Sequence, residues 1–201
     1  MIVTSIVPKG KTRCRITTDG GDFFVLSVRD VRLYGIEEGT EISDSVWSVI
    51  REQLRKEILQ ESAALLGSQD YTERRLSEKL LRKGYPEELV RDAVKSLKEA
   101  RYLDDRRLAE HYFQAHMQDR SAARIRQDLL SRGVDADLIE EVISTCPEEE
   151  LQEEQLQQIR QLLEKKHFDP ETADYAGIQK MAAFLYRRGF DPELIRRAMR
   201  T

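Results

Sequence analysis

Apolar positions in the first part of the chain follow a two-residue period, which is typical of β-strands. Three short runs combine β-branched or aromatic residues with polar ones: Ile2 to Val7, Arg13 to Thr17 and Phe23 to Ser27. Pro8-Lys9-Gly10 and Asp19-Gly20-Gly21 lie between these runs and have the composition of turns. The pattern therefore predicts a small β-meander at the start of the chain.

Beyond the meander, the apolar period changes to that of a helix. Ser43 or Asp44 can cap a helix, and one amphipathic stretch, continuous or broken, extends from there to about Leu66. A shorter helical turn is expected around Val28 and Val31. Everything after the amphipathic stretch also has helical periodicity, so we predict a mainly α protein with a small β-rich N-terminal segment.

One glycine-centred pattern occurs three times in the helical part. The copies are Leu80 to Tyr85, Leu129 to Val134 and Leu185 to Phe190, and the same apolar skeleton surrounds each glycine. A glycine after a helical run adopts the left-handed conformation without a Cβ clash, so it ends one helix and lets another begin. The pattern predicts a helix, a sharp turn and a second helix, three times over.

Capping residues support this prediction. Asp135 and Asp191 are placed to cap the helix after the glycine, and Pro86 and Pro192 are expected in its first turn, where a missing N–H is harmless. A further helix is expected before each pair, at about Glu52 to Leu66, Asp105 to Met117 and Glu148 to Lys165. Each unit should therefore contain three helices.

We accordingly expect four segments. Residues 1–43 form the β-rich segment, 44–102 a linking helix and the first three-helix repeat, 103–146 the second repeat, and 147–201 the third. The third repeat carries an insertion at His167 to Tyr175. Such small units bury little surface alone, so they are expected to pack end to end in a tandem array with a long exposed surface.

Charge limits the possible partners. The chain has 37 acidic and 33 basic residues, giving a net charge of −4, so any contact with nucleic acid must be local. Met1 to Val7 is apolar but short and lacks a basic leader, which favours a cytoplasmic protein without a membrane span. Cys14 and Cys146 have no CxxC partner and are interpreted as reduced structural thiols.

Basic residues recur at two positions of the repeated pattern. Arg75, Arg124 and Lys180 stand nine residues before the three glycines, and Lys83, Arg132 and Arg188 stand directly before them. One interpretation is a cationic stripe that meets phosphates or an acidic partner. The alternative is that cations complement the helix dipole, which explains the second set but not the first. The predicted partner- or DNA-binding residues are Arg75, Lys83, Arg124, Arg126, Arg132, Lys180, Arg187, Arg188, Arg196 and Arg197.

No catalytic or metal-binding constellation is predicted. His111 and His116 are five residues apart, and the chain lacks HExxH, a P-loop and GxGxxG. Tyr102-Leu103-Asp104-Asp105 is interpreted as a joint, with Asp104 capping the next helix and the apolar pair packed between units. Core packing rather than base stacking is assigned to Trp47, Tyr71, Tyr85, Tyr112 and Tyr186. The sequence predicts neither an enzyme nor a bound cofactor.

Three segments in order resemble the RecX family, the regulators of the RecA recombinase. They are Glu78 to Val90, Tyr102 to Asp105 and Arg124 to Leu129. The resemblance runs from about Ser62 to the end and is sharpest from Thr72 to Gly133, and the meander resembles an extension seen in some members. Gln69-Asp70-Tyr71-Thr72 departs from the basic, serine-containing turn that the family often has here.

The resemblance implies a non-enzymatic protein, expected to be a monomer, that binds RecA filaments on DNA. It implies inhibition or tuning of the RecA ATPase and of strand exchange, with the protein lying in the filament groove. An array of repeats suits this role, because a helical filament presents the same surface at a fixed repeat. Basic side chains would also contact single- or double-stranded DNA weakly and without sequence preference.

Two other classes of function remain open at this point. A helix-turn-helix regulator would use Arg91, Arg196 and Arg197 on the helices after the glycine turns, although the net charge argues against it. Such a regulator would bind naked DNA tightly and in a sequence-dependent way. A metal-dependent hydrolase built on Asp104, Asp105 and His111 would need a metal-dependent turnover.

Overall fold

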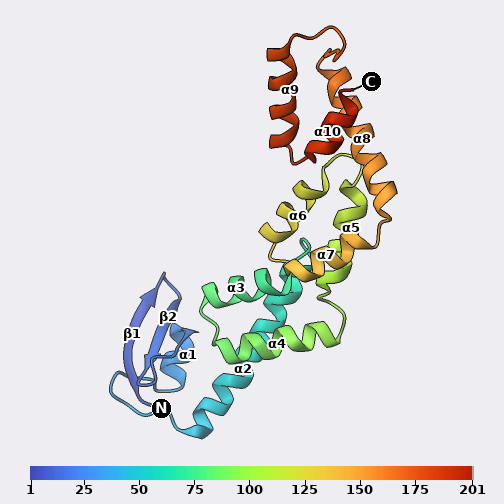
Figure 1. The fold of residues 1–201 in the computed structure, drawn as a ribbon. Coiled ribbons are helices and arrows are strands. Elements are labelled where there is room, and N and C mark those ends of the chain that lie inside the picture. The colour runs from blue at the N-terminus through green and yellow to red at the C-terminus, as the bar shows by residue number, and fades with distance from the viewer. Residues whose placement is uncertain (201) are drawn as a thin grey trace. The chain divides into compact units, whose positions relative to one another are not determined.

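The computed structural model describes residues 1–200, and the chain divides into two compact units. Figure 1 shows the elements of each. The first unit, Met1–Asp104, contains β1 (Val3–Lys9), β2 (Arg13–Thr18), β3 (Phe23–Ser27), α1 (Val28–Leu33), α2 (Asp44–Leu66), α3 (Glu73–Lys83) and α4 (Glu87–Glu99). The second, from Asp105 onward, contains α5 (Asp105–His116), α6 (Ala122–Ser131), α7 (Ala136–Ser144), α8 (Glu148–Lys165), α9 (Tyr175–Arg187) and α10 (Pro192–Ala198). The predicted fold class is confirmed.

The N-terminal meander is an antiparallel sheet with the strand order β1-β2-β3. The predicted turn at Pro8-Lys9-Gly10 is wrong in its first two residues, because β1 continues through Pro8 and Lys9, which pair with Cys14 and Arg13. A proline is tolerated there because β1 is an edge strand and needs no N–H from Pro8 for pairing within the sheet.

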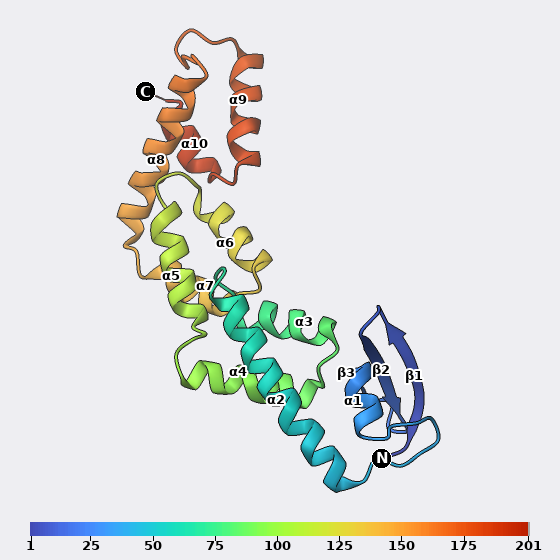
Figure 2. The same ribbon diagram turned by 180° about the vertical axis from the view of Figure 1, so that it is seen from behind.

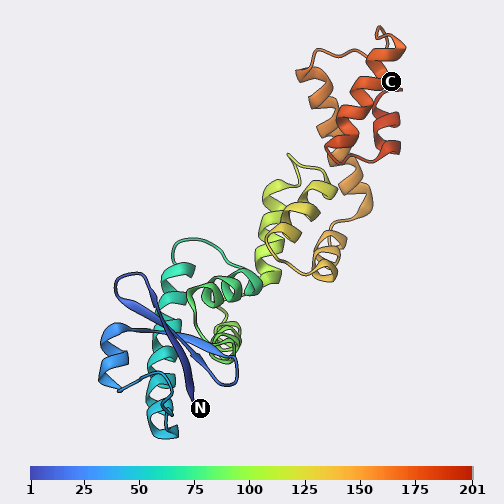
Figure 3. The ribbon, with the colours of Figure 1, turned by 90° about the vertical axis from the view of Figure 1, so that its left-hand side faces the viewer.

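The sheet and the helices of the first unit share one hydrophobic core. Helix α2 is continuous, is capped by Ser43 and buries Ile50, Leu54 and Ile58. Figure 3 shows the sheet lying against α2. Where they meet, the ring centroids of Phe24 in the sheet and Trp47 in α2 are 5.1 Å apart. A four-residue spacing puts the buried side chains of α2 on one stripe of the helix, which explains why the chain is helical there.

The first glycine turn is covered by the sheet. Gly84 has φ +98°, as the glycine pattern predicts, and its carbonyl accepts a hydrogen bond from the Val25 N–H at 3.0 Å. Lys9 Nζ donates to the carbonyl of Lys83 at 2.9 Å. The meander therefore stabilises the α3–α4 turn, a role for which the sequence contained no signal.

The second unit contains two hydrophobic clusters joined by α8. One cluster includes Phe113 and Ile125 from α5 and α6, and Leu151 at the start of α8 packs against it. The other includes Ile159 and Leu163 from the later part of α8, with further residues from α9 and α10. Figure 2 shows α9 and α10 along that part of α8. The left-handed turns at Gly133 and Gly189, with φ of +87° and +86°, are as predicted.

Three further local predictions are wrong. Pro86 is the N-cap residue of α4, with ψ of 138°, and so lies one residue before the first turn. Tyr102 is 68% exposed beside the buried Leu103, because the segment between α4 and α5 directs only one of these neighbours inward. Tyr186 is 64% exposed, because Leu185 occupies the inward position of that turn of α9. Neither tyrosine belongs to a core.

Several chemical features of the described residues bear on function. No helix among them is long and apolar enough to cross a membrane, and no group of three or more His, Cys, Asp or Glu side chains could hold a metal ion. Cys14 is buried, Cys146 is half-buried, and both are free thiols. Burial raises the pKa of the Cys146 thiol, which makes it less reactive at neutral pH.

Candidate cationic binding surface

Basic side chains gather around one hollow of about 650 Å³ in the second unit. Its walls come from the α5–α6 connection, the later part of α8 and the turn between α9 and α10. Figure 1 shows the start of α6 beside that turn. The lining contains five cations, Arg120, Arg124, Lys165, Arg187 and Arg188, and we call it the cationic hollow.

Arg120 is held in place by its neighbours. Its Nη1 donates to Asp128 Oδ2 at 2.7 Å and to the Tyr112 hydroxyl at 2.6 Å. The hydrogen bond with Asp128 raises the pKa of Arg120 above its ordinary value. Arg124 also reaches Asp128, with 3.2 Å between Nη2 and Oδ1, but remains 57% exposed. Arg120 therefore shapes the wall, whereas Arg124 keeps a face toward solvent.

A hydrogen bond joins two walls of the hollow. Ser121 caps α6 by accepting a bond from the N–H of Arg124 at 3.3 Å, and its hydroxyl donates to the carbonyl of Arg188 at 2.7 Å. Gly189 permits this approach, because a Cβ there would lie 2.9 Å from the Ser121 hydroxyl. The cations on the α9–α10 turn are thus held at the first turn of α6.

The remaining cations are not neutralised by the chain. Within residues 1–200, Lys165, Arg187 and Arg188 form no ion pair with a carboxylate. The Arg188 guanidinium lies 4.9 Å from the centre of the Phe184 ring, a cation–π contact that leaves its charge unopposed. Asp119 supplies the one carboxylate among the described lining residues, so the hollow is locally positive although the chain is net negative.

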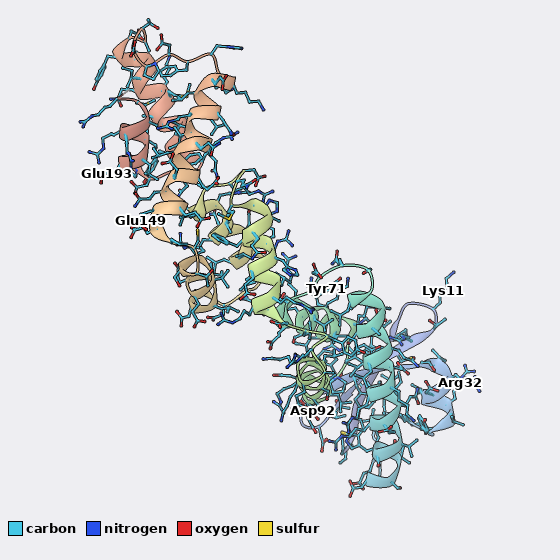
Figure 4. The ribbon with its side chains drawn as sticks, turned by 90° about the vertical axis from the view of Figure 1, so that its right-hand side faces the viewer. Lys11, Arg32, Tyr71, Asp92, Glu149 and Glu193 are labelled. Atoms are coloured by element: carbon cyan, nitrogen blue, oxygen red, sulfur yellow. The ribbon has the colours of Figure 1, made fainter. Side chains whose placement is uncertain are left out.

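Charge is also divided along α8. Its first turn contains Glu148, Glu149 and Glu150, while Lys165 is in its last turn. Figure 4 shows Glu149 at the first turn of the helix. Both ends complement the helix dipole, and the basic end opens into the hollow. The acidic run is thus accounted for by its place on the helix.

Two predicted cations of the second unit are engaged elsewhere. Arg126 donates from Nε and Nη2 to the carboxylate of Glu140, with 2.8 Å between Nη2 and Oε2. This bond lowers the pKa of Glu140 and raises that of Arg126. Arg132 lies over the ring of Tyr112, 4.6 Å from its centre. Three further predicted cations lie outside the lining of the hollow: Lys180, Arg196 and Arg197.

The predicted cations of the first unit, Arg75 and Lys83, are not among the residues that line the hollow. Lys83 pairs with Glu61 of α2, so part of its charge is neutralised within the unit. The hollow therefore unites only Arg124, Arg187 and Arg188 of the predicted set. Two cations of the hollow, Arg120 and Lys165, were not predicted from the sequence. The position of Arg120, directly before the cap residue Ser121, was a signal in the sequence for the first of them.

Comparison with family models identifies all three repeats. Residues 60–97 match the first three-helix domain of RecX, residues 104–143 the second and residues 152–199 the third. The regulatory protein RecX of Caldanaerobacter subterraneus subsp. tengcongensis is 32% identical over 203 residues, which cover 99% of this chain and 98% of that protein. This chain belongs to the RecX family. The resemblance found in the sequence is confirmed.

Other relatives agree with this assignment. The regulatory protein RecX of Trichlorobacter lovleyi is 37% identical over 136 residues, covering 66% of this chain and 86% of its own. A crystal structure of regulatory protein RecX aligns with 97% of both chains at a TM-score of 0.63 and 20% identity. The crystal structure of RecX from Lactobacillus salivarius gives the same TM-score at 16% identity, covering 74% of this chain and 96% of that one. The RecX fold thus extends over nearly the whole chain.

Proposed function

We propose that this protein regulates RecA by binding RecA filaments on DNA and inhibiting ATP hydrolysis and strand exchange. The observation that carries the proposal is the ordered match of residues 60–199 to the first, second and third RecX domains. The relatives that span the chain carry the name regulatory protein RecX. A regulator needs no catalytic centre of its own, so binding alone suffices for this function.

Repetition of the three-helix unit supports a filament as the partner. A RecA filament presents the same surface once per protomer, and several modest contacts along it would add through effective concentration. Contacts that bridge neighbouring protomers oppose the movements that accompany ATP hydrolysis. Local positive charge such as that of the cationic hollow would also give a weak, salt-dependent affinity for the bound DNA strand without sequence preference.

Titration into RecA assembled on single-stranded DNA tests the proposal. We expect ATP hydrolysis and strand exchange to fall as the protein approaches a stoichiometric ratio to RecA. Unchanged rates at an excess of folded protein would reject it. Binding to naked duplex DNA should be weak and indifferent to sequence, whereas tight binding to one sequence would favour a helix-turn-helix regulator.

A further inference from the structure

We propose that Leu81, Leu130 and Tyr186 each dock into an apolar pocket with an acidic rim, a pocket present once on every RecA protomer of the filament. We call these three side chains the apolar triplet. The inference rests on the proposed function and names the residues through which the repeats contact the filament. It is distinct from a cationic stripe, because uncharged side chains carry most of the affinity.

The members of the apolar triplet occupy the same place in their repeats. Each stands three residues before the glycine of the turn, at 81, 130 and 186 for the glycines at 84, 133 and 189. The exposed fractions of Leu81, Leu130 and Tyr186 are 36%, 44% and 64%. The residue directly before each of them is a fully buried leucine: Leu80, Leu129 and Leu185. Each second helix therefore combines one inward leucine with one outward apolar side chain.

The fold itself does not require an apolar side chain at this place. The backbone carbonyls of Leu81, Leu130 and Tyr186 accept the N–H of the turn glycine at 2.9, 2.9 and 2.8 Å, which a residue of any type would do. Within residues 1–200, none of the three side chains belongs to a hydrophobic cluster. Leucine favours a helix, but tyrosine ranks well below it, so helix propensity does not explain all three. Their recurrence needs a cause outside the chain.

Exposed apolar side chains are confined to the second helices in this part of the chain. Among helices α3 to α10, as far as residue 200, the large hydrophobic residues that are exposed lie only on α3, α6 and α9. They are the apolar triplet and Tyr175, which begins α9 after the insertion and has aspartates at the equivalent positions of the other repeats. Figures 1 and 2 both show α6 and α9 on the same side of α8. Single exposed hydrophobic residues are normal, but one that recurs at the same position of three repeats indicates a shared contact.

This recurrence identifies a partner that presents one surface many times. Equivalent side chains on equivalent helices suit equivalent pockets, and a helical filament carries the same pocket on each protomer. A partner with a single pocket would need only one of the repeats. Once one member of the triplet is bound, the others bind at a high effective concentration, so three modest apolar contacts give a tight complex.

The residue types at these positions favour a protein pocket over a nucleic acid. Single strands are held by bases stacked on aromatic rings, and phosphates are bound by polar groups, so Leu81 and Leu130 offer neither contact. Leucine and tyrosine both fill apolar pockets of proteins.

A cation two residues after each member of the triplet indicates the charge of the pocket's rim. These cations are Lys83, Arg132 and Arg188. They favour acidic side chains at the edge of each pocket. Lys83 already pairs with Glu61, whereas Arg188 forms no ion pair within residues 1–200. The contribution of charge is therefore expected to be largest in the third repeat.

Fluorescence anisotropy of the labelled full chain tests the apolar triplet, with RecA filaments assembled on single-stranded DNA and a non-hydrolysable ATP analogue. The variant Leu81→Ala/Leu130→Ala/Tyr186→Ala should bind filaments about a hundredfold more weakly than the unaltered protein. The matched control Leu33→Ala/Leu59→Ala/Tyr175→Ala removes the same side chains from exposed positions outside the repeated pattern. We expect less than a threefold loss for this control. Equal losses for the two variants would overturn the proposal.

Single substitutions test whether the three contacts are equivalent. Leu81→Ala, Leu130→Ala and Tyr186→Ala should each weaken binding to the filament by about fivefold, because each removes one of three similar contacts. A loss confined to one of the three would overturn docking on repeated pockets. These variants also keep the proposal open to test if the triple variant fails to fold, which circular dichroism checks.

A probe without RecA separates the filament protein from its DNA. The triple variant should bind a labelled oligothymidylate strand as weakly as the unaltered protein does. If it loses affinity for the naked strand as much as for the filament, the triplet contacts DNA and the proposal is wrong.

Inhibition of RecA by the unaltered protein distinguishes this inference from the proposed function. If that protein inhibits RecA and the folded triple variant binds filaments equally well, the docking residues are wrong and the regulation of RecA stands. If the unaltered protein neither binds filaments nor inhibits RecA, the proposed function fails, and the assignment of the triplet to RecA fails with it.

Discussion

The hydroxyl of Ser121 donates a 2.7 Å hydrogen bond to the backbone carbonyl of Arg188, 67 residues further along the chain. The same oxygen caps α6, so one side chain both begins a helix of the second repeat and holds the glycine turn of the third. Through this bond, the stability of α6 and the position of the cations on the α9–α10 turn depend on each other.

Ser121→Ala should therefore lower the free energy of unfolding by more than the loss of an ordinary helix cap does. We expect a fall of about 2 kcal/mol in the free energy of unfolding of the second unit, from a lost cap and a lost tertiary hydrogen bond. Urea denaturation measures it, and the N–H of Gly189 should exchange faster with solvent. Ser43→Ala is the control, because Ser43 caps the exposed start of α2 and should cost about 0.5–1 kcal/mol. Equal costs for the two serines would contradict the double role.

Gly84→Ala should destabilise the first unit through two effects. The positive φ of Gly84 is unfavourable for alanine, and a Cβ there would overlap the Cγ2 atom of Val25. We expect a loss of roughly 2–4 kcal/mol in urea denaturation. Gly39→Ala carries only the first effect, since its φ is +77° and nothing lies within 4 Å of the added Cβ, so about 1–2 kcal/mol is expected.

A second substitution isolates the overlap at Gly84. Val25→Ala removes the Cγ2 atom, so Gly84→Ala should cost clearly less in that background than in the unaltered protein. A double-mutant cycle with the four proteins gives this coupling energy directly. Zero coupling would show that backbone strain alone accounts for the destabilisation, and that the sheet is not tightly packed on the α3–α4 turn.

Local signals in the sequence predicted most of the fold. The glycines at 84, 133 and 189 end helices because their left-handed conformation is a property of a few neighbouring residues. Helix capping also depends on a few neighbouring residues, and the helices after Ser43, Asp135 and Asp191 are capped by these side chains. Errors occur where the local pattern permits two outcomes, as at Pro86, which suits both the N-cap and the first turn. Strand pairing, not composition, decided the end of β1.

The candidate site was less predictable, because it depends on tertiary contacts. Arg124 and Arg188 stand 64 positions apart, and tertiary contacts such as that of Ser121 with the Arg188 carbonyl bring their surroundings together. The equal repeat position of Arg124 and Lys180 suggested equal roles, yet only Arg124 lines the hollow. Lys165 was missed because a lysine in the last turn of a helix is already explained by the dipole. A cationic stripe along the second helices stays a prediction.

The pair of Arg126 and Glu140 predicts a pH-dependent contribution to stability. Because its hydrogen bonds with Arg126 lower the pKa of Glu140, the unfolded chain binds this proton more readily than the folded chain. The stabilisation is therefore complete above the unfolded pKa of about 4.3 and disappears as the pH falls through the lower folded value. Since both side chains are more than a third exposed, we expect only about 0.5–1 kcal/mol.

Glu140→Gln should accordingly lower the free energy of unfolding at pH 7 and leave it nearly unchanged at pH 2.5. Urea denaturation at both pH values measures the difference. In the background of Arg126→Gln, the same substitution should have no effect at either pH, because its partner is absent. An effect that persists without Arg126, or at the lower pH, would assign the stabilisation to another contact of Glu140.

Charge reversal at Arg124 and Arg132 tests whether the basic positions of the second repeat contribute to regulation of RecA. Neither side chain is buried, so Arg124→Glu/Arg132→Glu should fold, which circular dichroism checks. If these cations meet the filament, we expect about a tenfold higher concentration for half-inhibition of RecA ATP hydrolysis, equivalent to about 1.4 kcal/mol of binding. Added salt should weaken the unaltered protein more than the variant, because fewer ionic contacts remain to be screened in the variant.

The matched control for this prediction is Lys95→Glu/Arg160→Glu, which makes the same change in net charge at exposed positions of α4 and α8. It should inhibit like the unaltered protein. Full inhibition by the folded Arg124→Glu/Arg132→Glu variant would return both arginines to local roles, with Arg124 held by Asp128 and Arg132 over the Tyr112 ring. A loss shared by both variants would mean that the filament responds to overall charge, since only a specific contact distinguishes one basic position from another.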